Sequence, residues 1–262
     1  MLDLEEPILP LVATFLATRH LWLDVPRLLA AWQDAGVMRQ GVATWFDVPL
    51  EQISYDVVMD GRGLGSFESR WKNGPAELIP LAQQFALSTL DFTFNWVDTT
   101  GSMLLRLSVN EDNSVELYMD TPTSDVFYGQ TKQVGEQNLH RFVDFACALF
   151  APRVFIVGYI DVEAALGSLD GLLSGTRRVP DDWAFYGAGI APYLERVLPS
   201  LQSQPKEVRQ LPTNGLFVRW SDWGQSKWDR PKAFKEWKTA IDEAVRNFAG
   251  TELRSELSGG WS

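Results

Sequence analysis

Residues 90–96, Leu-Asp-Phe-Thr-Phe-Asn-Trp, alternate large apolar and small polar side chains. Successive side chains of a β-strand point to opposite faces, so this alternation predicts a strand with one dry face and one polar face. Short polar turns join it to two further apolar runs, 103–109 and 115–119. The spacing predicts an antiparallel meander over 90–119.

Two stretches after the meander carry apolar residues at helical spacing and predict amphipathic helices over 136–150 and 231–248. The apolar stripes are Leu139, Phe142, Val143, Ala146, Cys147 and Phe150 in the first, and Phe234, Trp237, Ile241, Ala244, Val245 and Phe248 in the second. Both helices are expected to pack on the sheet and to bury Phe142, Cys147, Phe234 and Trp237.

The same patterns place the remaining elements. Strands are expected at 8–18, 53–59 and 154–160, together with a hairpin that pairs 208–211 with 216–220 through an Asn-Gly turn. Helices are expected at 24–36, with Asp24 as the N-cap, at 75–86 and at 189–201. Because helices are interspersed with antiparallel hairpins, the pattern predicts the α+β class, with a mixed, largely antiparallel sheet and helices packed on it.

The chain has 262 residues, enough for one large domain or two small ones. Hydrophobic residues make up 45% and charged residues 22%, which is globular usage rather than the composition of a disordered chain. Residues 167–180 are rich in Gly and Ser and predict a linker or a long surface loop. We therefore expect either a single α+β domain over 1–262 or two sub-units divided near 167–180.

The formal net charge is −11, and most of the acidic excess lies upstream of residue 225. Such a field repels nucleic acid and anionic membranes and attracts basic partners. No apolar run approaches the about 20 residues that a membrane span needs, and the N-terminus is acidic where a signal peptide would be basic. The sequence also has one cysteine, Cys147, which permits no intramolecular disulfide. A cytoplasmic protein is expected.

The residues that usually carry chemistry are few and scattered. The two histidines, His20 and His140, lie far apart, and no ligand cluster has metal-site spacing. The glycines of 61–65 do not lead straight into a helix, as a phosphate loop requires. We expect no catalytic residue, no metal and no cofactor. A hydrolase or transferase stays open as an alternative, with a site assembled only in the fold from Asp161, Glu163, Asp181 and Asp182.

Four of the eleven tryptophans, Trp220, Trp223, Trp228 and Trp237, fall within eighteen residues. One interpretation is a helix docked on the sheet through its tryptophans. The other is an exposed rim of aromatic and charged residues around Trp223 and Trp228, a composition that protein interfaces favour. Lysines and arginines in this region would also suit nucleic acid, but the negative net charge opposes that interpretation.

Two short stretches resemble a known family. Residues 181–187, Asp-Asp-Trp-Ala-Phe-Tyr-Gly, and residues 209–218, Arg-Gln-Leu-Pro-Thr-Asn-Gly-Leu-Phe-Val, are similar to the W-x-F-Y-G and L-P-x-G-G-hydrophobic ending of small acidic α+β immunity proteins encoded beside bacterial polymorphic toxins. Here Thr213-Asn214-Gly215 stands where the family has paired glycines. The resemblance, confined to 181–220, implies a cytosolic inhibitor that binds a toxin domain without catalysis.

The sequence therefore predicts a non-enzymatic protein that binds another, basic protein, in the manner of an immunity protein. Acids at 181 and 182 are interpreted as the N-terminus of a helix. The residues expected to bind the partner are Trp223, Trp228, Asp222, Asp181 and Asp182. No nucleic acid and no membrane partner is expected. Besides the enzyme alternative, a structural subunit of a larger assembly stays open.

Overall fold

The computed structural model describes residues 10–18, 20–36, 38–60, 65–122, 126, 130–161, 166–223 and 233–248. The chain forms two compact units. Unit 1 comprises Met1–Thr14, Arg19–Leu149 and Ile160–Ala165, and unit 2 comprises Phe15–Thr18, Phe150–Tyr159 and Leu166–Ser262. Both combine helices with antiparallel strands, so the α+β class is confirmed.

Unit 1 is built on an antiparallel sheet in the strand order β3-β2-β4-β5-β6. The strands are β2 (Gly41–Pro49), β3 (Ser66–Trp71), β4 (Phe85–Asn95), β5 (Thr100–Val109) and β6 (Val115–Pro122). The predicted meander is confirmed, because Leu90 of β4 pairs with Leu105 of β5, and Leu105 pairs with Met119 of β6. Strand β1 (Pro10–Ala17) lies next to β6 and belongs to unit 1 as far as Thr14.

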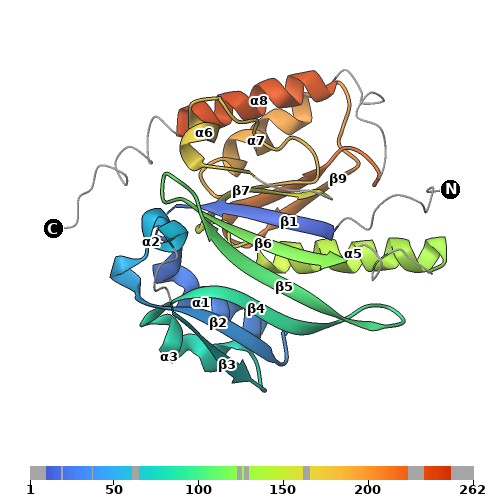
Figure 1. Cartoon of the computed structure of the whole chain (residues 1–262). Coiled ribbons are helices and arrows are strands. Elements are labelled where there is room, and N and C mark those ends of the chain that lie inside the picture. The colour runs from blue at the N-terminus through green and yellow to red at the C-terminus, as the bar shows by residue number, and fades with distance from the viewer. Residues whose placement is uncertain are drawn as a thin grey trace. The chain divides into compact units, whose positions relative to one another are not determined.

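The long helix of unit 1 covers the dry face of this sheet. The helices are α1 (Leu21–Asp34), α2 (Tyr55–Asp60), α3 (Ile79–Ala82) and α5 (Lys132–Leu149), with 3-10 turns η1 (Leu50–Gln52) and η2 (Pro75–Leu78). Phe145 of α5 packs against Phe92 and Phe94 of β4, with ring centroids 5.6 and 5.1 Å apart. The indole of Trp32 in α1 donates a hydrogen bond of 3.2 Å to the carbonyl of Leu149, which joins α1 to α5 behind the strands (Figure 1).

Unit 2 has its own antiparallel strands in the order β7-β8-β10-β9. They are β7 (Phe155–Asp161), which belongs to this unit as far as Tyr159, β8 (Ala184–Tyr186), β9 (Glu207–Leu211) and β10 (Gly215–Arg219). The predicted hairpin is confirmed as the pair β9 and β10. Its connection η4 (Pro212–Asn214) holds Thr213 and Asn214 at positive φ, 58° and 64°, a conformation that asparagine tolerates better than most residues.

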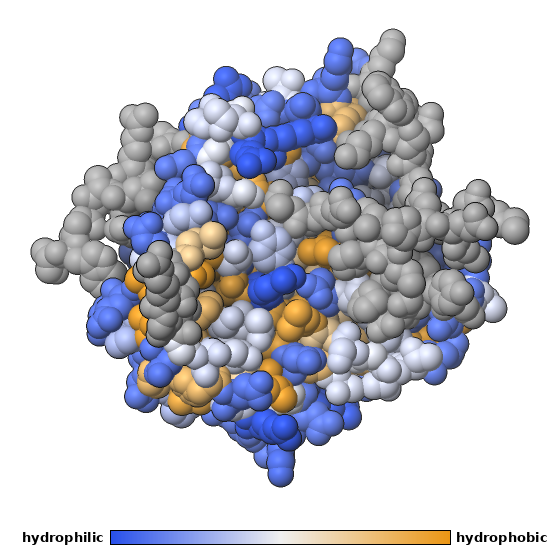
Figure 2. Space-filling view, viewed as in Figure 1, coloured by the Kyte–Doolittle hydropathy of each residue, from blue (hydrophilic) through white to orange (hydrophobic). Residues whose placement is uncertain are grey.

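Helices α6 (Leu169–Leu173), α7 (Ala191–Val197) and α8 (Ala233–Phe248), with the turn η3 (Leu198–Ser200), complete unit 2. Trp237 of α8 is fully buried and packs against Tyr186 and Trp220, with ring centroids 5.8 and 6.1 Å apart. The outer side of α8 is hydrophilic (Figure 2), in keeping with the exposed Lys235 and Glu236. An amphipathic helix thus buries its apolar stripe in the core of unit 2, as the periodicity predicts.

Three of the four predicted core residues are buried, namely Phe142, Cys147 and Trp237. The fourth prediction is wrong in degree: Phe234 is only partly buried and packs at the edge of the core of unit 2. Its ring lies 5.9 Å from that of Trp220, in the first turn of α8.

Three local predictions are wrong. Where a strand was predicted over 53–59, residues Tyr55–Asp60 form the helix α2, because Ser54 precedes it and its hydroxyl accepts a hydrogen bond from the amide of Val57, as an N-cap does. Helix α1 begins at Leu21, so Asp24 lies within its first turn and is not the N-cap. The helix expected at 75–86 ends at Ala82, and Phe85 already belongs to β4.

The segment 167–180 is not a bare linker, because part of it is folded into unit 2. Ser168 caps α6 by accepting a hydrogen bond of 3.1 Å from the amide of Gly171, and Leu169 and Leu172 are buried in the core. The chain passes from one unit to the other at 14/15, 18/19, 149/150, 159/160 and 165/166, and none of these points lies within 167–180. The Gly and Ser residues of this stretch therefore form the N-cap of α6, part of the helix itself and the turn that follows it.

Candidate functional site

Asp182, one of the residues expected to contact a partner, is buried and holds the backbone of unit 2 together. Its Oδ1 accepts hydrogen bonds from the amides of Trp183 (2.9 Å), Trp220 (2.7 Å) and Ser221 (3.3 Å). Its Oδ2 accepts a further hydrogen bond from the hydroxyl of Ser221. With 9% of its surface exposed, Asp182 joins the start of β8 to the end of β10 and does not present a carboxylate to a partner.

Asp181 is also buried and is directed into the same unit. The guanidinium of Arg178 forms an ion pair with its carboxylate, and its carbonyl accepts a hydrogen bond of 3.0 Å from the indole of Trp237. Strand β8 follows at Ala184, so the predicted helix N-terminus at 181–182 is wrong. The acidic pair therefore stabilises unit 2, and neither aspartate belongs to an exposed contact surface.

The buried acidic pair also affects the pKa of the neighbouring Tyr186. Complete burial, and next the negative charges of Asp181 and Asp182, raise the pKa of Tyr186 well above its usual range. Its hydroxyl donates a hydrogen bond of 2.8 Å to the carbonyl of Pro180. The phenol therefore stays protonated and acts as a structural donor. Of the other acids proposed for an enzyme site, Asp161 belongs to unit 1 and Glu163 lies outside the described residues.

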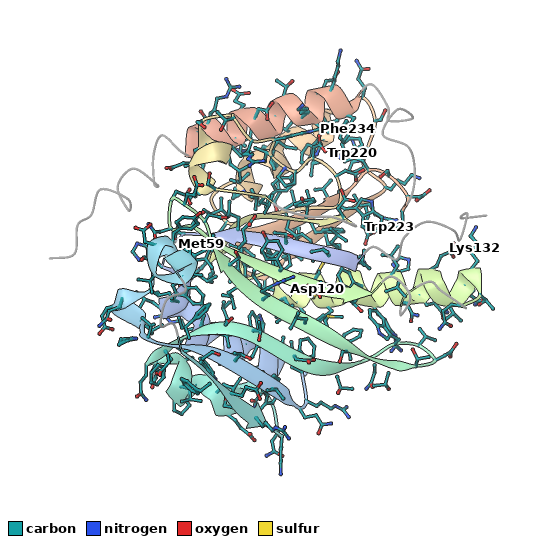
Figure 3. The ribbon with its side chains drawn as sticks, viewed as in Figure 1. Met59, Asp120, Lys132, Trp220, Trp223 and Phe234 are labelled. Carbon is teal, nitrogen blue, oxygen red and sulfur yellow. The ribbon has the colours of Figure 1, made fainter. Side chains whose placement is uncertain are left out.

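Trp223 lies on the surface of unit 2 in contact with a second aromatic ring. Its ring meets that of Trp183 edge-on, with centroids 5.5 Å apart. The guanidinium carbon of Arg219 lies 5.1 Å from the centre of the Trp183 ring, which is a cation–π contact. Trp183 has a positive φ of 48°, and for a bulky residue this backbone conformation is an outlier that the surrounding contacts must hold. Figure 3 shows Trp223 apart from Trp220 and Phe234, whose rings contact each other at the start of α8.

Charged side chains surround this aromatic contact. Arg219 Nε lies 2.9 Å from Glu207 Oε2, and the two residues are directly opposite each other on β10 and β9. Asp222 pairs with Lys206, whose hydrogen bond is the main cause that holds the pKa of Asp222 below its usual range. We define the Trp223 rim as the set that these contacts connect: the accessible side chains of Lys206, Glu207, Arg219, Asp222 and Trp223, together with Trp183, which supports them and is itself buried with 6% of its surface exposed.

The Trp223 rim adjoins the edge of a sheet. Strand β9 is the last strand in the order, and within the described residues it pairs only with β10. Glu207 belongs to β9, and the next residue, Val208, is a large apolar side chain with 45% of its surface exposed. An edge strand presents backbone donors and acceptors to which a second chain can pair. The second predicted tryptophan, Trp228, lies outside the described residues.

The acidic charge resides in the other unit. Unit 1 contains 22 Asp and Glu against 9 Lys and Arg, a formal charge of −13, whereas unit 2 contains 12 against 14, a formal charge of +2. The aromatic surface is therefore part of a nearly neutral unit, and the long-range field of the protein originates in unit 1. The sequence already places most of the acidic excess upstream of residue 225, and the division into units assigns it to unit 1 and the Trp223 rim to unit 2.

Two further observations bear on chemistry. Among the described residues, no group of three or more His, Cys, Asp or Glu side chains is arranged to hold a metal ion. Within the same part of the chain, no helix combines the length and the apolar character that crossing a membrane requires.

Sequence reasoning missed four members of the rim: Trp183, Lys206, Glu207 and Arg219. The hairpin itself was predicted, but its register was not: in the structure Leu211 pairs with Gly215, and this register places the carboxylate of Glu207 opposite the guanidinium of Arg219. The stack of Arg219 on Trp183 had no indication in the sequence.

Comparisons with protein-family models, with curated proteins and with solved structures found no match. The resemblance of residues 181–220 to immunity proteins stays a prediction, and the function is argued from the residues of the rim.

Proposed function

We propose that this protein acts by binding another protein, and that the Trp223 rim together with the edge of β9 forms the contact surface. The observation that supports the proposal is the stack of Arg219 on Trp183, with Trp223 packed edge-on against the same ring. Tryptophan and arginine are the side chains that most often supply the energy of protein interfaces. Here they are held in place by contacts within unit 2, so little conformational entropy is lost on binding.

The partner that fits this surface is a basic protein with an extended segment. Such a segment can add to the open edge of β9 through backbone hydrogen bonds, with Val208 available for an apolar contact. The net charge of −11 raises the rate of encounter with a positively charged protein. More specifically, we propose that the partner is a toxin domain, because residues 181–220 resemble immunity proteins that inhibit toxins.

The first test measures two effects separately: that of charge on the association rate and that of Trp223 on the dissociation rate. The partner is isolated from the native host at low salt, purified, and measured by surface plasmon resonance. The association rate is expected to fall as salt rises, because screening shortens the field to about 8 Å at physiological ionic strength. Trp223→Ala is expected to speed dissociation by about tenfold or more, which corresponds to about 1.4 kcal/mol of lost contact.

The matched control is Leu23→Ala, which truncates an apolar side chain that is 53% exposed on α1 of unit 1. It should leave both rate constants unchanged. Val208→Lys adds a charge at the edge of β9, where strand addition would have to occur, and should weaken binding without loss of stability. The proposal is wrong if a purified partner dissociates from Trp223→Ala and Leu23→Ala at the same rate, or if no protein is captured at low salt.

A further inference from the structure

A pocket of about 770 Å³ opens in unit 1 and is separate from the Trp223 rim of unit 2. It is bounded by the end of α1, the end of β4 and one side of α5. Its volume is in the range of roughly 300–1,000 Å³ that small-molecule sites occupy. The charged and aromatic side chains in its lining are Arg39, Lys72, Arg141, Asp144, Phe94 and Phe145.

The charge of this pocket is opposite to that of its unit. Unit 1 has a formal charge of −13, yet three of its nine basic residues, Arg39, Lys72 and Arg141, line this one pocket against the single carboxylate of Asp144. Like charges repel, so bringing three cations to one pocket costs electrostatic energy unless anionic groups lie close to them. The presence of three cationic side chains in one pocket of this acidic unit therefore has to be explained.

Other basic residues of unit 1 do have carboxylate partners. Arg27, Arg106 and Lys132 lie 3.4, 3.0 and 3.7 Å from the carboxylates of Asp24, Asp120 and Glu136, respectively. Within the described residues, none of the three pocket cations forms an ion pair. Within this part of the chain the positive charge of the pocket is therefore balanced only in part, by Asp144 in the lining and by Glu77, whose pKa is lowered by the hydrogen bond from the Lys72 amide and, to a smaller extent, by the charge of Lys72.

One of the three cations is held by the backbone around it, and the backbone of a second is fixed by a nearby carboxylate. Nη1 of Arg141 donates to the carbonyls of Asn95 (3.0 Å) and Trp96 (3.1 Å), which holds the guanidinium at the end of β4. The amide of Lys72 donates to Oε2 of Glu77 at 3.1 Å, which fixes the loop after β3. Arg39 follows the left-handed turn at Gly36 that ends α1.

Hydrogen bonds to backbone carbonyls account for the position of only one of the three cations. Arg141 serves the carbonyls of Asn95 and Trp96 directly, but in the described structure the side chains of Arg39 and Lys72 donate no hydrogen bond. Both are exposed at the pocket and available to a ligand. The floor beside them is aromatic, because Phe94 and Phe145 line the pocket with their ring centroids 5.1 Å apart.

We infer that this pocket binds a small organic anion, with its phosphate or carboxylate group at Arg39, Lys72 and Arg141 and its apolar part on Phe94 and Phe145. Guanidinium and ammonium groups form charge-assisted hydrogen bonds with such anions. The negative field of unit 1 slows the approach of the ligand, but screening limits this effect beyond about 8 Å, whereas the three cations act at contact distance. The inference is independent of protein binding by unit 2.

The test uses the full chain and four probes in isothermal titration calorimetry: inorganic phosphate, phenyl phosphate, benzoate and benzamidine. Phenyl phosphate should bind more tightly than inorganic phosphate because it also reaches the aromatic floor. Comparison of phenyl phosphate with benzoate identifies which anionic group the pocket prefers. The cation benzamidine should give no heat of binding.

Substitutions of the cationic side chains test whether the ligand binds in this pocket. Arg39→Gln and Lys72→Gln should each weaken phenyl phosphate by about tenfold, as expected for the loss of one charge-assisted contact of about 1.4 kcal/mol. Both side chains are exposed, so the melting temperature of each variant without ligand should equal that of the wild type. Arg70→Gln, on β3 and outside the pocket lining, is the matched control and should bind as the wild type does.

Two results would overturn the inference. One is the absence of binding by either organic anion at about 10 mM, which is weaker than any useful affinity on this scale. The other is equal affinity of Arg39→Gln, Lys72→Gln and Arg70→Gln for phenyl phosphate. If phenyl phosphate binds no more tightly than inorganic phosphate, the assignment of Phe94 and Phe145 as the floor is wrong.

Discussion

Truncation of Trp237 tests how α8 is held on unit 2. The side chain is fully buried, contacts the rings of Tyr186 and Trp220, and donates a hydrogen bond of 3.0 Å to the carbonyl of Asp181. A buried tryptophan removes about 150–250 Å² from water, which at about 25 cal/mol per Å² is about 4–6 kcal/mol. Measured losses for such truncations are about 3–5 kcal/mol. Trp237→Ala is therefore expected to cost about 3–5 kcal/mol.

That loss is comparable to the whole stability of many domains, about 5–15 kcal/mol. It is measured by urea unfolding followed by far-UV circular dichroism, because the substitution itself changes the tryptophan fluorescence. Trp237→Phe keeps an aromatic ring and loses the N–H donor, so it should cost less than Trp237→Ala. Trp223→Ala, at a partly exposed position, should also cost less. A loss below about 1 kcal/mol for Trp237→Ala would show that α8 is not docked through this residue.

Two further predictions concern buried and half-buried acids. Asp182→Asn replaces a carboxylate that accepts from three amides and a hydroxyl, and is expected to cost about 2–3 kcal/mol in urea unfolding; an unchanged midpoint and slope would contradict this role. Burial raises the pKa of Asp120 above its usual 3.8 despite the nearby Arg106. The folded state therefore binds this proton more tightly than the unfolded state, and stability attributable to Asp120 falls as pH rises from 3.8 through the folded pKa. Asp120→Asn should raise the urea midpoint more at pH 7 than at about pH 4, and an equal effect at both pH values would refute this cause.

The sequence determined the elements whose residues need only their neighbours along the chain. Alternation over 90–96 predicted β4, and helical periodicity over 136–150 and 231–248 predicted α5 and α8. These predictions are confirmed because strand and helix periods are local properties, and an apolar stripe on either must be buried. The hairpin of β9 and β10 was predicted for the same reason, since a short turn fixes which strands pair.

Local patterns failed where a distant contact outweighed them. The run Val57-Val58 favours a strand, yet α2 forms there, and besides the Ser54 cap its Tyr55 amide donates to the side chain of Asn113 at 2.9 Å. Adjacent acids at 181 and 182 suggest an exposed helix start. In the structure Asp182 is buried, because the amides of Trp220 and Ser221, 38 and 39 residues later, supply its hydrogen bonds.

Only the tertiary structure decided both proposed sites. The rim brings Trp183 under Arg219, and the pocket of unit 1 brings Arg39, Lys72 and Arg141 together from three segments. No period or short motif relates these positions, so nothing local predicts them. The energy that assembles them comes from burying the apolar faces of strands and helices, and the exposed charges take positions that this packing imposes. The sequence by itself therefore specified the class of fold and its main elements, whereas the arrangement of surface charge followed from how those elements pack.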